Sequence, residues 1–139
     1  MNTQKNLAFV QDMYAAFARG DIAYVLARVP EDCAEFGVIA AAKSAVPWHI
    51  DSRGKTGAAK FFEALGGAVE YQAFEPCDYA AVGDHVYVTI HHRMKVRATG
   101  ESMELKETIH HIQFKEGNLA RWVCSEDTKA SHEVFARAR

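Results

Sequence analysis

The chain has 139 residues, of which 49% are hydrophobic and 24% charged, and its net charge is −2. This composition indicates one globular domain, residues 1–139, with a core large enough to fold without disulfides or a structural metal. It excludes the basic surface that nucleic acids require, and no stretch approaches the roughly 20 apolar residues of a membrane span. The N-terminus lacks the apolar run of a signal peptide and the three cysteines show no CxxC spacing, so we expect a cytoplasmic protein without a zinc or redox motif.

Helical patterns fill the first half of the chain. Thr3 can cap a helix that ends at Gly20, and its apolar residues recur at spacings of three and four. Asp21 can cap a second, short helix that ends before Pro30. The buried positions expected in these two helices are Leu7, Val10, Tyr14, Phe17, Ile22, Val25, Leu26 and Val29.

Between the helices of the first half lie a short strand and a loop. Residues 34–40 predict the strand, and residues 41–54 lack periodicity and predict the loop. Thr56 can cap a third helix, which the pair at 66–67, Gly-Gly, is expected to stop. The expected buried positions of this helix are Phe61, Phe62 and Leu65.

The second half predicts an antiparallel meander. Four runs rich in β-branched and aromatic residues are separated by glycine-containing turns, and they cover residues 68–82, 85–97, 102–115 and 119–126. Pro76 is expected to bend the first strand, and Asp127 can cap a final helix. Helices followed by such a meander predict an α+β fold, in which a cone-shaped curved antiparallel sheet packs against N-terminal helices and leaves a hollow between them.

Turn lengths set the register of neighbouring strands, and register decides which side chains share a face. A two-residue loop at 99–100 places Thr89 opposite His110, and a three-residue loop at 115–117 places His110 opposite Trp122. The face expected to line a pocket then carries Tyr87, Thr89, His91, Thr108, His110, Ile112, Phe114, Trp122, Cys124 and Glu126. The opposite face carries Val86, Val88, Ile90, His92, Met94, Val96, Met103, Leu105, Ile109, His111 and Val123.

The second of these faces has no helix to cover it in the predicted arrangement. A large uncovered apolar face is typical of an interface between proteins. We therefore expect the face with Val86, Val88, Ile90 and Met94 to form a homodimer by sheet-on-sheet packing. A one-residue slip at either turn would exchange the roles of the two faces.

Several segments of the chain resemble one superfamily. Residues 10–21 resemble the opening helix and turn of the nuclear transport factor 2-like superfamily, as do the helix with Gly54, Phe61 and Phe62 and the strand start at 83–86. The run 110–119 and the pair Asp127-Thr128 resemble its SnoaL-like polyketide cyclase and ketosteroid isomerase branch. The resemblance implies a cone-shaped α+β domain that is often dimeric through its sheet. It also implies a branch of isomerases, cyclases, hydrolases and dehydratases alongside binding proteins.

The resemblance can be tested against the residues that steroid isomerases use. These enzymes use an Asp as base, with a Tyr and a protonated Asp as oxyanion donors. Matched on Gly20-Asp21, the Tyr falls on Met13, the base Asp on or near Gly37, and the oxyanion Asp on His110. All three differ from the pattern, so steroid isomerisation is not expected. His110 nevertheless keeps an inward position that relatives use for chemistry.

The candidate catalytic residues are His110 and Glu126. A neutral His in a half-apolar cavity can donate or accept a proton near neutral pH, and a buried carboxylate can orient it or act as a base. The alternatives are a His bonded only within the fold and a Glu at a solvated strand end. Asp127 is expected to be a helix cap.

The candidate ligand-binding residues surround this pair. Trp48 and His49 lie in the loop that relatives close over the pocket, where they can stack on and hydrogen-bond a planar ligand. The remaining candidates on the expected walls are Tyr14, Tyr87, Thr89, His91 and Trp122. No metal-ligand spacing, phosphate loop or nucleotide fingerprint occurs, so neither a metal nor another cofactor is expected.

Two classes of function follow from this pattern. The first is a cofactor-independent enzyme of isomerase, cyclase, dehydratase or hydrolase type, which acts by proton transfer on a small apolar organic substrate. The second is a non-catalytic ligand-binding or accessory homodimer with the same pocket. A structural dimer with a filled cavity is a third alternative.

Overall fold

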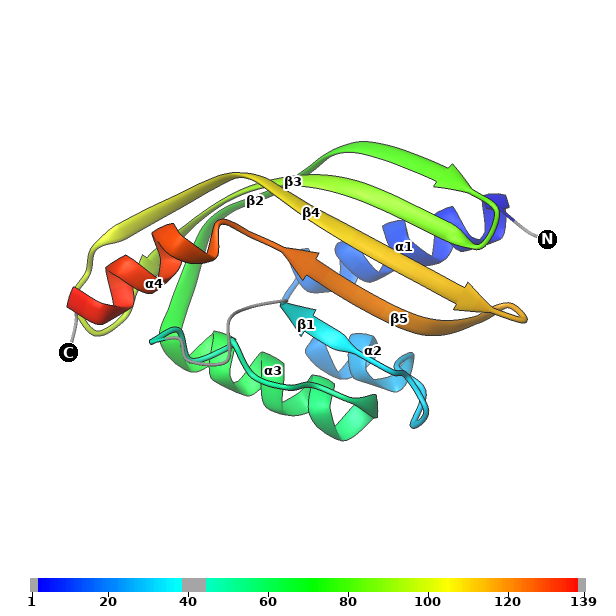
Figure 1. The fold of residues 1–139 in the computed structure, drawn as a ribbon, viewed down its shortest axis with the longest axis horizontal. Coiled ribbons are helices and arrows are strands. Elements are labelled where there is room, and N and C mark those ends of the chain that lie inside the picture. The colour runs from blue at the N-terminus through cyan, green and yellow to red at the C-terminus, as the bar shows by residue number, and fades with distance from the viewer. Residues whose placement is uncertain (1–2, 39–44, 138–139) are drawn as a thin grey trace.

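A curved sheet of five strands forms one side of the molecule, and helices lie against its concave face (Figure 1). The computed structural model describes residues 3–38 and 45–137. In chain order the elements are α1 (Thr3–Ala18), α2 (Ile22–Ala27), β1 (Phe36–Val38), α3 (Gly54–Ala68), β2 (Val69–Val82), β3 (His85–Val96), β4 (Ser102–Lys115), β5 (Asn118–Ser125) and α4 (Thr128–Arg137).

The strands follow the order β1-β5-β4-β3-β2 across the sheet. The four long strands pair with their sequence neighbours in antiparallel fashion, whereas β1 pairs with β5 in parallel. This confirms the predicted α+β fold with a curved, unclosed sheet and N-terminal helices. Within the described ranges, no helix is both long and apolar enough to cross a membrane.

The helix caps form as the sequence predicts. The backbone N–H of Tyr24 donates to Oδ1 of Asp21 over 3.0 Å, and that of Ala130 donates to Oδ1 of Asp127 over 3.0 Å. These side chains satisfy N–H groups that the first turns of α2 and α4 cannot pair internally. Asp127 is therefore a cap.

Helix α3 differs from the prediction at both ends. It begins at Gly54 rather than after Thr56, and it continues through the Gly-Gly pair at 66–67 to Ala68. Gly54 has φ +66°, and a Cβ there would lie 2.5 Å from the carbonyl oxygen of Glu31. Only glycine fits such a position without strain, so backbone crowding sets the start of the helix. Residues 41–44 of the predicted loop 41–54 lie outside the described residues, as do residues 39–40 of the predicted strand 34–40.

The pairing of β4 with β5 differs from the prediction by two residues but keeps the predicted faces. Glu116 and Gly117 both have positive φ and form a two-residue turn, because Lys115 pairs with Asn118. A register shift between Gln113 and Phe114 then places His110 opposite Cys124 rather than Trp122. A change of two positions restores the same face, so His110 and Trp122 point to the same side of the sheet, as predicted.

The predicted faces of β3 are wrong. The loop before β4 is longer than two residues, since the N–H of Val96 donates to the carbonyl of Glu101. A bulge in β4 at residues 106–107 then adds one residue opposite His91. As a result Val88, not Thr89, pairs with His110. The bulge adds a single residue to β4. Beyond it, residues of β3 and β4 that were expected to share a face therefore point to opposite sides of the sheet.

The reversal moves the expected interface into the core. Val86, Val88, Ile90 and Met94 are each at most 1% exposed, because they face the helices rather than solvent. The homodimer cannot use these residues. The outward face of β3 carries Tyr87, Thr89 and His91, together with His85, Arg93 and Lys95.

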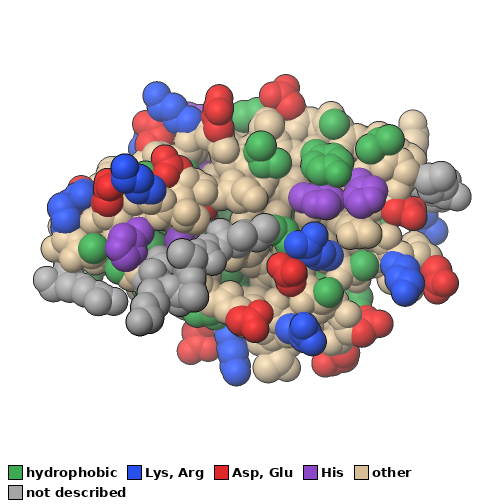
Figure 2. Space-filling model, in the orientation of Figure 1, with side chains coloured by type: hydrophobic (Ala, Val, Ile, Leu, Met, Phe, Trp, Pro, Cys, Tyr) green, Lys and Arg blue, Asp and Glu red, His purple; other side chains and the backbone are tan. Residues whose placement is uncertain are grey.

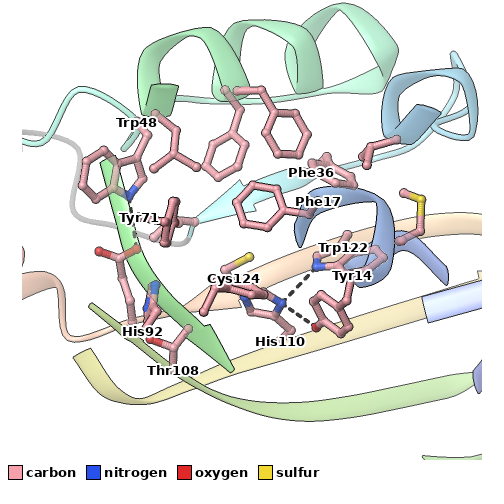
Figure 3. A pocket seen from close by; sticks show the side chains of 18 residues that line it. Tyr14, Phe17, Phe36, Trp48, Tyr71, His92, Thr108, His110, Trp122 and Cys124 are labelled. Carbon is pink, nitrogen blue, oxygen red and sulfur yellow. Dashed lines mark hydrogen bonds between the residues drawn. The ribbon is translucent and has the colours of Figure 1, made fainter. Parts of the chain in front are cut away.

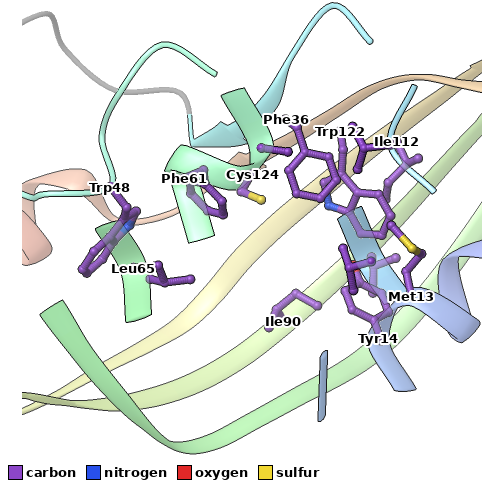
Figure 4. Packing of buried hydrophobic residues seen from close by; sticks show 14 of the residues in the cluster. Met13, Tyr14, Phe36, Trp48, Phe61, Leu65, Ile90, Ile112, Trp122 and Cys124 are labelled. Carbon is purple, nitrogen blue, oxygen red and sulfur yellow. The ribbon is translucent and has the colours of Figure 1, made fainter. Parts of the chain in front are cut away.

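Aromatic rings bridge the sheet and the helices in the core (Figure 4). The ring of Trp122 on β5 lies 5.5 Å from those of Tyr14 on α1 and Phe36 on β1. Near the other end of the molecule, the fully buried Trp48 meets Phe135 of α4 edge-on at 5.2 Å. Both tryptophans therefore hold a helix or a loop against the sheet.

Candidate functional site

A cavity of about 70 Å³ lies between α1, α3 and the concave face of the sheet (Figure 3). Its walls are mostly aromatic and its polar groups few, a combination typical of sites for small organic molecules. The aromatic wall comprises Tyr14, Phe17, Phe36, Trp48, Phe61, Phe62, Tyr71, Phe74 and Trp122. The polar and sulfur-bearing side chains on the wall are His92, Thr108, His110, Cys124 and Glu126.

His110 projects from β4 into this cavity, and two donors hold its ring. Nδ1 lies 2.7 Å from the hydroxyl oxygen of Tyr14 and 3.3 Å from Nε1 of Trp122. An indole N–H can only donate, so Nδ1 of His110 must be the unprotonated nitrogen and the Tyr14 hydroxyl donates to it as well. The neutral ring therefore carries its hydrogen on Nε2.

Burial keeps this ring neutral. The pKa of His110 falls from 6.5 to about 3, chiefly because burial penalises the charged form and secondarily because His92 lies nearby. Burial likewise raises the pKa of the Tyr14 hydroxyl well above its ordinary value, so Tyr14 remains a donor. At neutral pH His110 can offer Nε2–H to an oxygen atom, whereas its only lone pair in the ring plane already accepts two hydrogen bonds.

Glu126 lies just beyond the end of β5, and the loop before α3 closes over it. Its Oε1 accepts a hydrogen bond from Nε1 of Trp48 over 3.1 Å, and its Oε2 lies 3.2 Å from Nε2 of His49. The side chains of His49 and Glu126 are 0% and 3% exposed. A carboxylate has about four acceptor positions, so Glu126 keeps capacity to accept a proton or a ligand donor. The sequence-based alternative of a solvated strand end is therefore wrong.

His92 also lines the cavity, although the sequence analysis placed it on the opposite face. Its Nε2 lies 2.8 Å from Oγ1 of Thr108, and its ring stacks on Tyr71 at 5.9 Å with an interplanar angle of 14°. Burial lowers its pKa from 6.5 to about 4, although the charge of Glu126 acts in the opposite direction. The bulge at 106–107 is what brings His92 to the same wall as His110.

Three candidate ligand-binding residues lie outside the cavity. The bulge in β4 changes which face of β3 lies beside His110. The side chains that point outward from β3 therefore include Tyr87, Thr89 and His91. Their contacts are on the outer surface: Tyr87 stacks on His111, Thr89 donates to Asp78, and Nε2 of His91 lies 2.8 Å from Oε1 of Glu104. The prediction that they line the pocket is wrong. Tyr14, Trp48 and Trp122 do line it, and His49 contacts it through Glu126.

The sequence analysis missed several wall residues of β2 and α1. Tyr71 and Phe74 face the cavity from β2, where register shifts after Tyr71 and Pro76 alter the alternation of side chains. Phe17 and Met13 reach it from α1. The helical spacing of Phe17 with Tyr14 was the available signal for the α1 wall, but an irregular strand gives no such signal.

A wider hollow of about 410 Å³ adjoins the cavity and opens near the C-terminal ends of α1 and α3. The two spaces share the side chains of Phe17, Phe62, Leu65, Tyr71 and Phe74. These shared side chains separate the two spaces.

Metal ligands do not cluster in residues 3–38 and 45–137, where no group of three or more His, Cys, Asp or Glu side chains could hold an ion. The cavity residues present neutral N–H donors and one carboxylate. Such a set suits an organic molecule with oxygen acceptors.

Comparisons with known proteins agree with this fold. The sequence profile of the SnoaL-like domain family matches residues 10–122. A nuclear transport factor 2-like protein from Burkholderia xenovorans LB400 is 28% identical, with a TM-score of 0.77 over 99% of this chain and 98% of that chain. A second such protein, from Burkholderia thailandensis E264, is 24% identical, with a TM-score of 0.78 over 99% and 98% of the two chains. The comparison with curated proteins found no match.

A third similar structure contains an organic molecule. TerC, co-crystallised with polyporic acid, is 20% identical, with a TM-score of 0.78 over 96% of this chain and 99% of that chain. At this identity the likeness shows the fold alone.

Proposed function

Because the chain belongs to the SnoaL-like domain family, we propose that it binds a small, mostly apolar organic molecule and moves a proton on it without a cofactor. The reaction type is the removal of a proton from a carbon next to a carbonyl group, as isomerases and cyclases require. The observation that carries this proposal is the fixed neutral tautomer of His110. This ring carries its hydrogen on Nε2 and lines an aromatic cavity that the carboxylate of Glu126 also lines.

The two polar groups take complementary roles. The Nε2–H of His110 donates to the carbonyl oxygen and stabilises the negative charge that develops there when the neighbouring carbon loses its proton. A neutral imidazole can act in this way, because a neutral His polarises the substrate carbonyl group in a known isomerase. Glu126 accepts the proton. This differs from the sequence-based expectation, in which His110 itself was the acid–base group.

The environment supports these roles physically. Aromatic walls exclude water, which strengthens the hydrogen bond from His110 to a developing oxyanion. Tyr14 and Trp122 hold the imidazole in one orientation, so little reorganisation is needed during the reaction. The bonds from Trp48 and His49 position the carboxylate in the same way.

Hydrogen–deuterium exchange tests this proposal without knowledge of the natural substrate. Cyclohexanone is incubated with the protein in D₂O, and loss of the proton signal next to the carbonyl is followed by NMR. We expect the wild type to accelerate exchange, Glu126→Gln to lose about 100-fold or more of the acceleration, and His110→Ala to lose a similar amount. His91→Ala, on the outer face, is the matched control and should match the wild type.

A specific observation also favours the non-catalytic alternative. Both oxygens of Glu126 already contact protein groups, as they would in a carboxylate that only closes the loop over the cavity. The same experiment separates the two readings. Cyclohexanone that binds by calorimetry but exchanges no faster than in buffer would assign the protein to ligand binding alone.

A further inference from the structure

His92 lines the cavity, and one of its two ring nitrogens is buried without a partner. His92 is 4% exposed, and its Nδ1 is the buried side-chain nitrogen or oxygen without a hydrogen bond among residues 3–38 and 45–137. Buried polar groups nearly always have a partner, since leaving one unpaired is costly. An unpaired atom at the wall of a cavity points to a ligand that completes it.

The partner of the other ring nitrogen indicates what this ligand must offer. Nε2 of His92 pairs with the hydroxyl of Thr108, which is 1% exposed and makes no other side-chain hydrogen bond within the described chain. If Nε2 donated, the Thr108 hydrogen and Nδ1 would both be unpaired. If the hydroxyl donates to Nε2, only Nδ1 is unpaired, and it then carries the hydrogen. The arrangement with fewer unpaired groups makes Nδ1 of His92 a donor.

His92 and His110 lie at separate places along the same wall (Figure 3). The ring of Phe74 contacts both, with centroids 5.9 Å from His92 and 6.4 Å from His110. Burial lowers the pKa of both rings, so both remain neutral donors near pH 7. Glu126 adds negative charge to this wall, which disfavours an anionic ligand.

We infer that His92 is a second anchor of the binding site and that the ligand is an uncharged dicarbonyl compound. One of its oxygens accepts from Nε2–H of His110 and the other from Nδ1–H of His92. This inference rests on the proposed function, because it assumes that the cavity binds an organic carbonyl compound. It adds that His92 determines specificity for the second oxygen.

Three six-membered rings of similar size test the inference by titration calorimetry: methylcyclohexane, cyclohexanone and cyclohexane-1,4-dione. We expect the dione to bind wild-type protein at least about 10-fold more tightly than cyclohexanone, because it satisfies a donor that is otherwise unpaired. The variant is His92→Phe combined with Thr108→Val, which replaces the bonded pair by apolar groups of similar shape. It should lose the preference for the dione and bind the dione no more tightly than cyclohexanone.

The melting temperature of the double variant distinguishes a role of His92 in ligand binding from a role in folding. Removing an unpaired buried N–H should leave the melting temperature of the double variant unchanged or higher. A large fall would mean that His92 serves folding, and it would overturn the inference. If the double variant does not fold, the ¹⁵N resonance of His92 Nδ1 in the wild type decides: it must shift when the dione is added and must not shift with methylcyclohexane.

The failures of the two proposals are distinguishable. Equal binding of cyclohexanone and the dione to the wild type would overturn the role of His92 and leave the proposed function intact. If neither ketone binds, the proposed function fails and the inference fails with it.

Discussion

Trp122 donates its indole N–H to Nδ1 of His110, which also accepts a hydrogen bond from the hydroxyl of Tyr14. A donor-only group at Nδ1 settles the tautomer of the ring without any assumption about the ligand. We expect ¹⁵N spectra of His110 to show an unprotonated Nδ1 and a protonated Nε2 throughout the range from about pH 5 to pH 8. A ring that titrates in this range, or that carries its hydrogen on Nδ1, would contradict the assignment.

The two cavity histidines make stability depend on pH. Burial lowers the pKa of His92 to about 4 and that of His110 to about 3, against 6.5 for an unburied ring. Below pH 6.5 the unfolded chain therefore binds protons that the folded chain excludes. Their contribution to the free energy of unfolding is complete above pH 6.5 and falls by about 1.4 kcal/mol per pH unit for each ring as the pH drops toward 4.

Urea unfolding at several pH values checks this dependence. In the double variant of His92→Phe with Thr108→Val, the slope below pH 6.5 should be shallower by about 1.4 kcal/mol per pH unit than in the wild type. Ile50→Ala, at an exposed site without a titratable group in the loop before α3, should keep the wild-type slope. Equal slopes for all three proteins would show that His92 is not held neutral by burial.

The hydrogen bond between Trp48 and Glu126 should give a measurable interaction free energy in a double-mutant cycle. Trp48→Phe keeps most of the ring that packs on Phe135 but removes the N–H that donates to the carboxylate. We expect it to lower the free energy of unfolding by about 1–3 kcal/mol. In a Glu126→Leu background the same change should cost at least about 1 kcal/mol less, because no carboxylate is left unpaired. Additive effects in this double-mutant cycle would mean that the bond contributes nothing.

Two glycines of α3 should respond to alanine in opposite directions. Gly54→Ala places a Cβ 2.5 Å from the carbonyl oxygen of Glu31 at a φ of +66°, so we expect a loss of about 2 kcal/mol or more. Gly66 lies inside the helix, and a Cβ there meets no atom within 4 Å. Gly66→Ala should therefore raise stability by about 0.5–1 kcal/mol. Thermal unfolding of both variants tests the start of α3 and its continuation through the glycine pair.

The expected homodimer must use outward-facing residues of the sheet, and we propose Val82, Tyr87 and Ile109, which are 65%, 38% and 46% exposed. On this side of the molecule, two adjacent histidine side chains are bordered by hydrophobic ones (Figure 2). Such an exposed apolar group on a rigid sheet suits packing against a second copy. His85 and His111 of the outer face also bond to each other, with Nδ1 and Nε2 separated by 2.8 Å.

Mass measurement in solution tests this surface. Sedimentation of the wild type should give twice the chain mass, and Ile109→Lys should give the mass of one chain, because a buried lysine charge disfavours the interface. Ile50→Lys, at a similarly exposed isoleucine in the loop before α3, is the matched control and should remain dimeric. A wild-type monomer would remove the proposal.

The sequence predicted the element types well and the β3 face badly, for one physical reason. Runs of β-branched and aromatic residues between glycine-containing turns located the four long strands, and the caps at Asp21 and Asp127 located two helices. Alternation alone, however, cannot reveal a bulge, because a bulge changes pairing without changing composition. The predicted pairing of β3 with β4 is therefore wrong at residues 106–107, and His92 lies in the cavity rather than in the expected interface.

The site was predictable where it depended on a face that survived this error. His110 lies on β4, Trp122 on β5 and Glu126 just after β5, and the two one-residue errors in the register of these strands add to two, which restores the predicted face. The contact of Trp48 with Glu126 joins residues 78 positions apart, and no local pattern predicts such a contact. The tautomer of His110 likewise required the positions of Tyr14 and Trp122 in space.

The placement of the tryptophans has a practical consequence. The chain contains two of them, Trp48 and Trp122, and both line the cavity and donate an N–H to a site residue. Indole emission depends on the polarity around the ring and on its hydrogen bonds. All of the intrinsic tryptophan fluorescence of this protein therefore originates at the wall of its cavity, so an unlabelled sample can report occupancy in a compound screen.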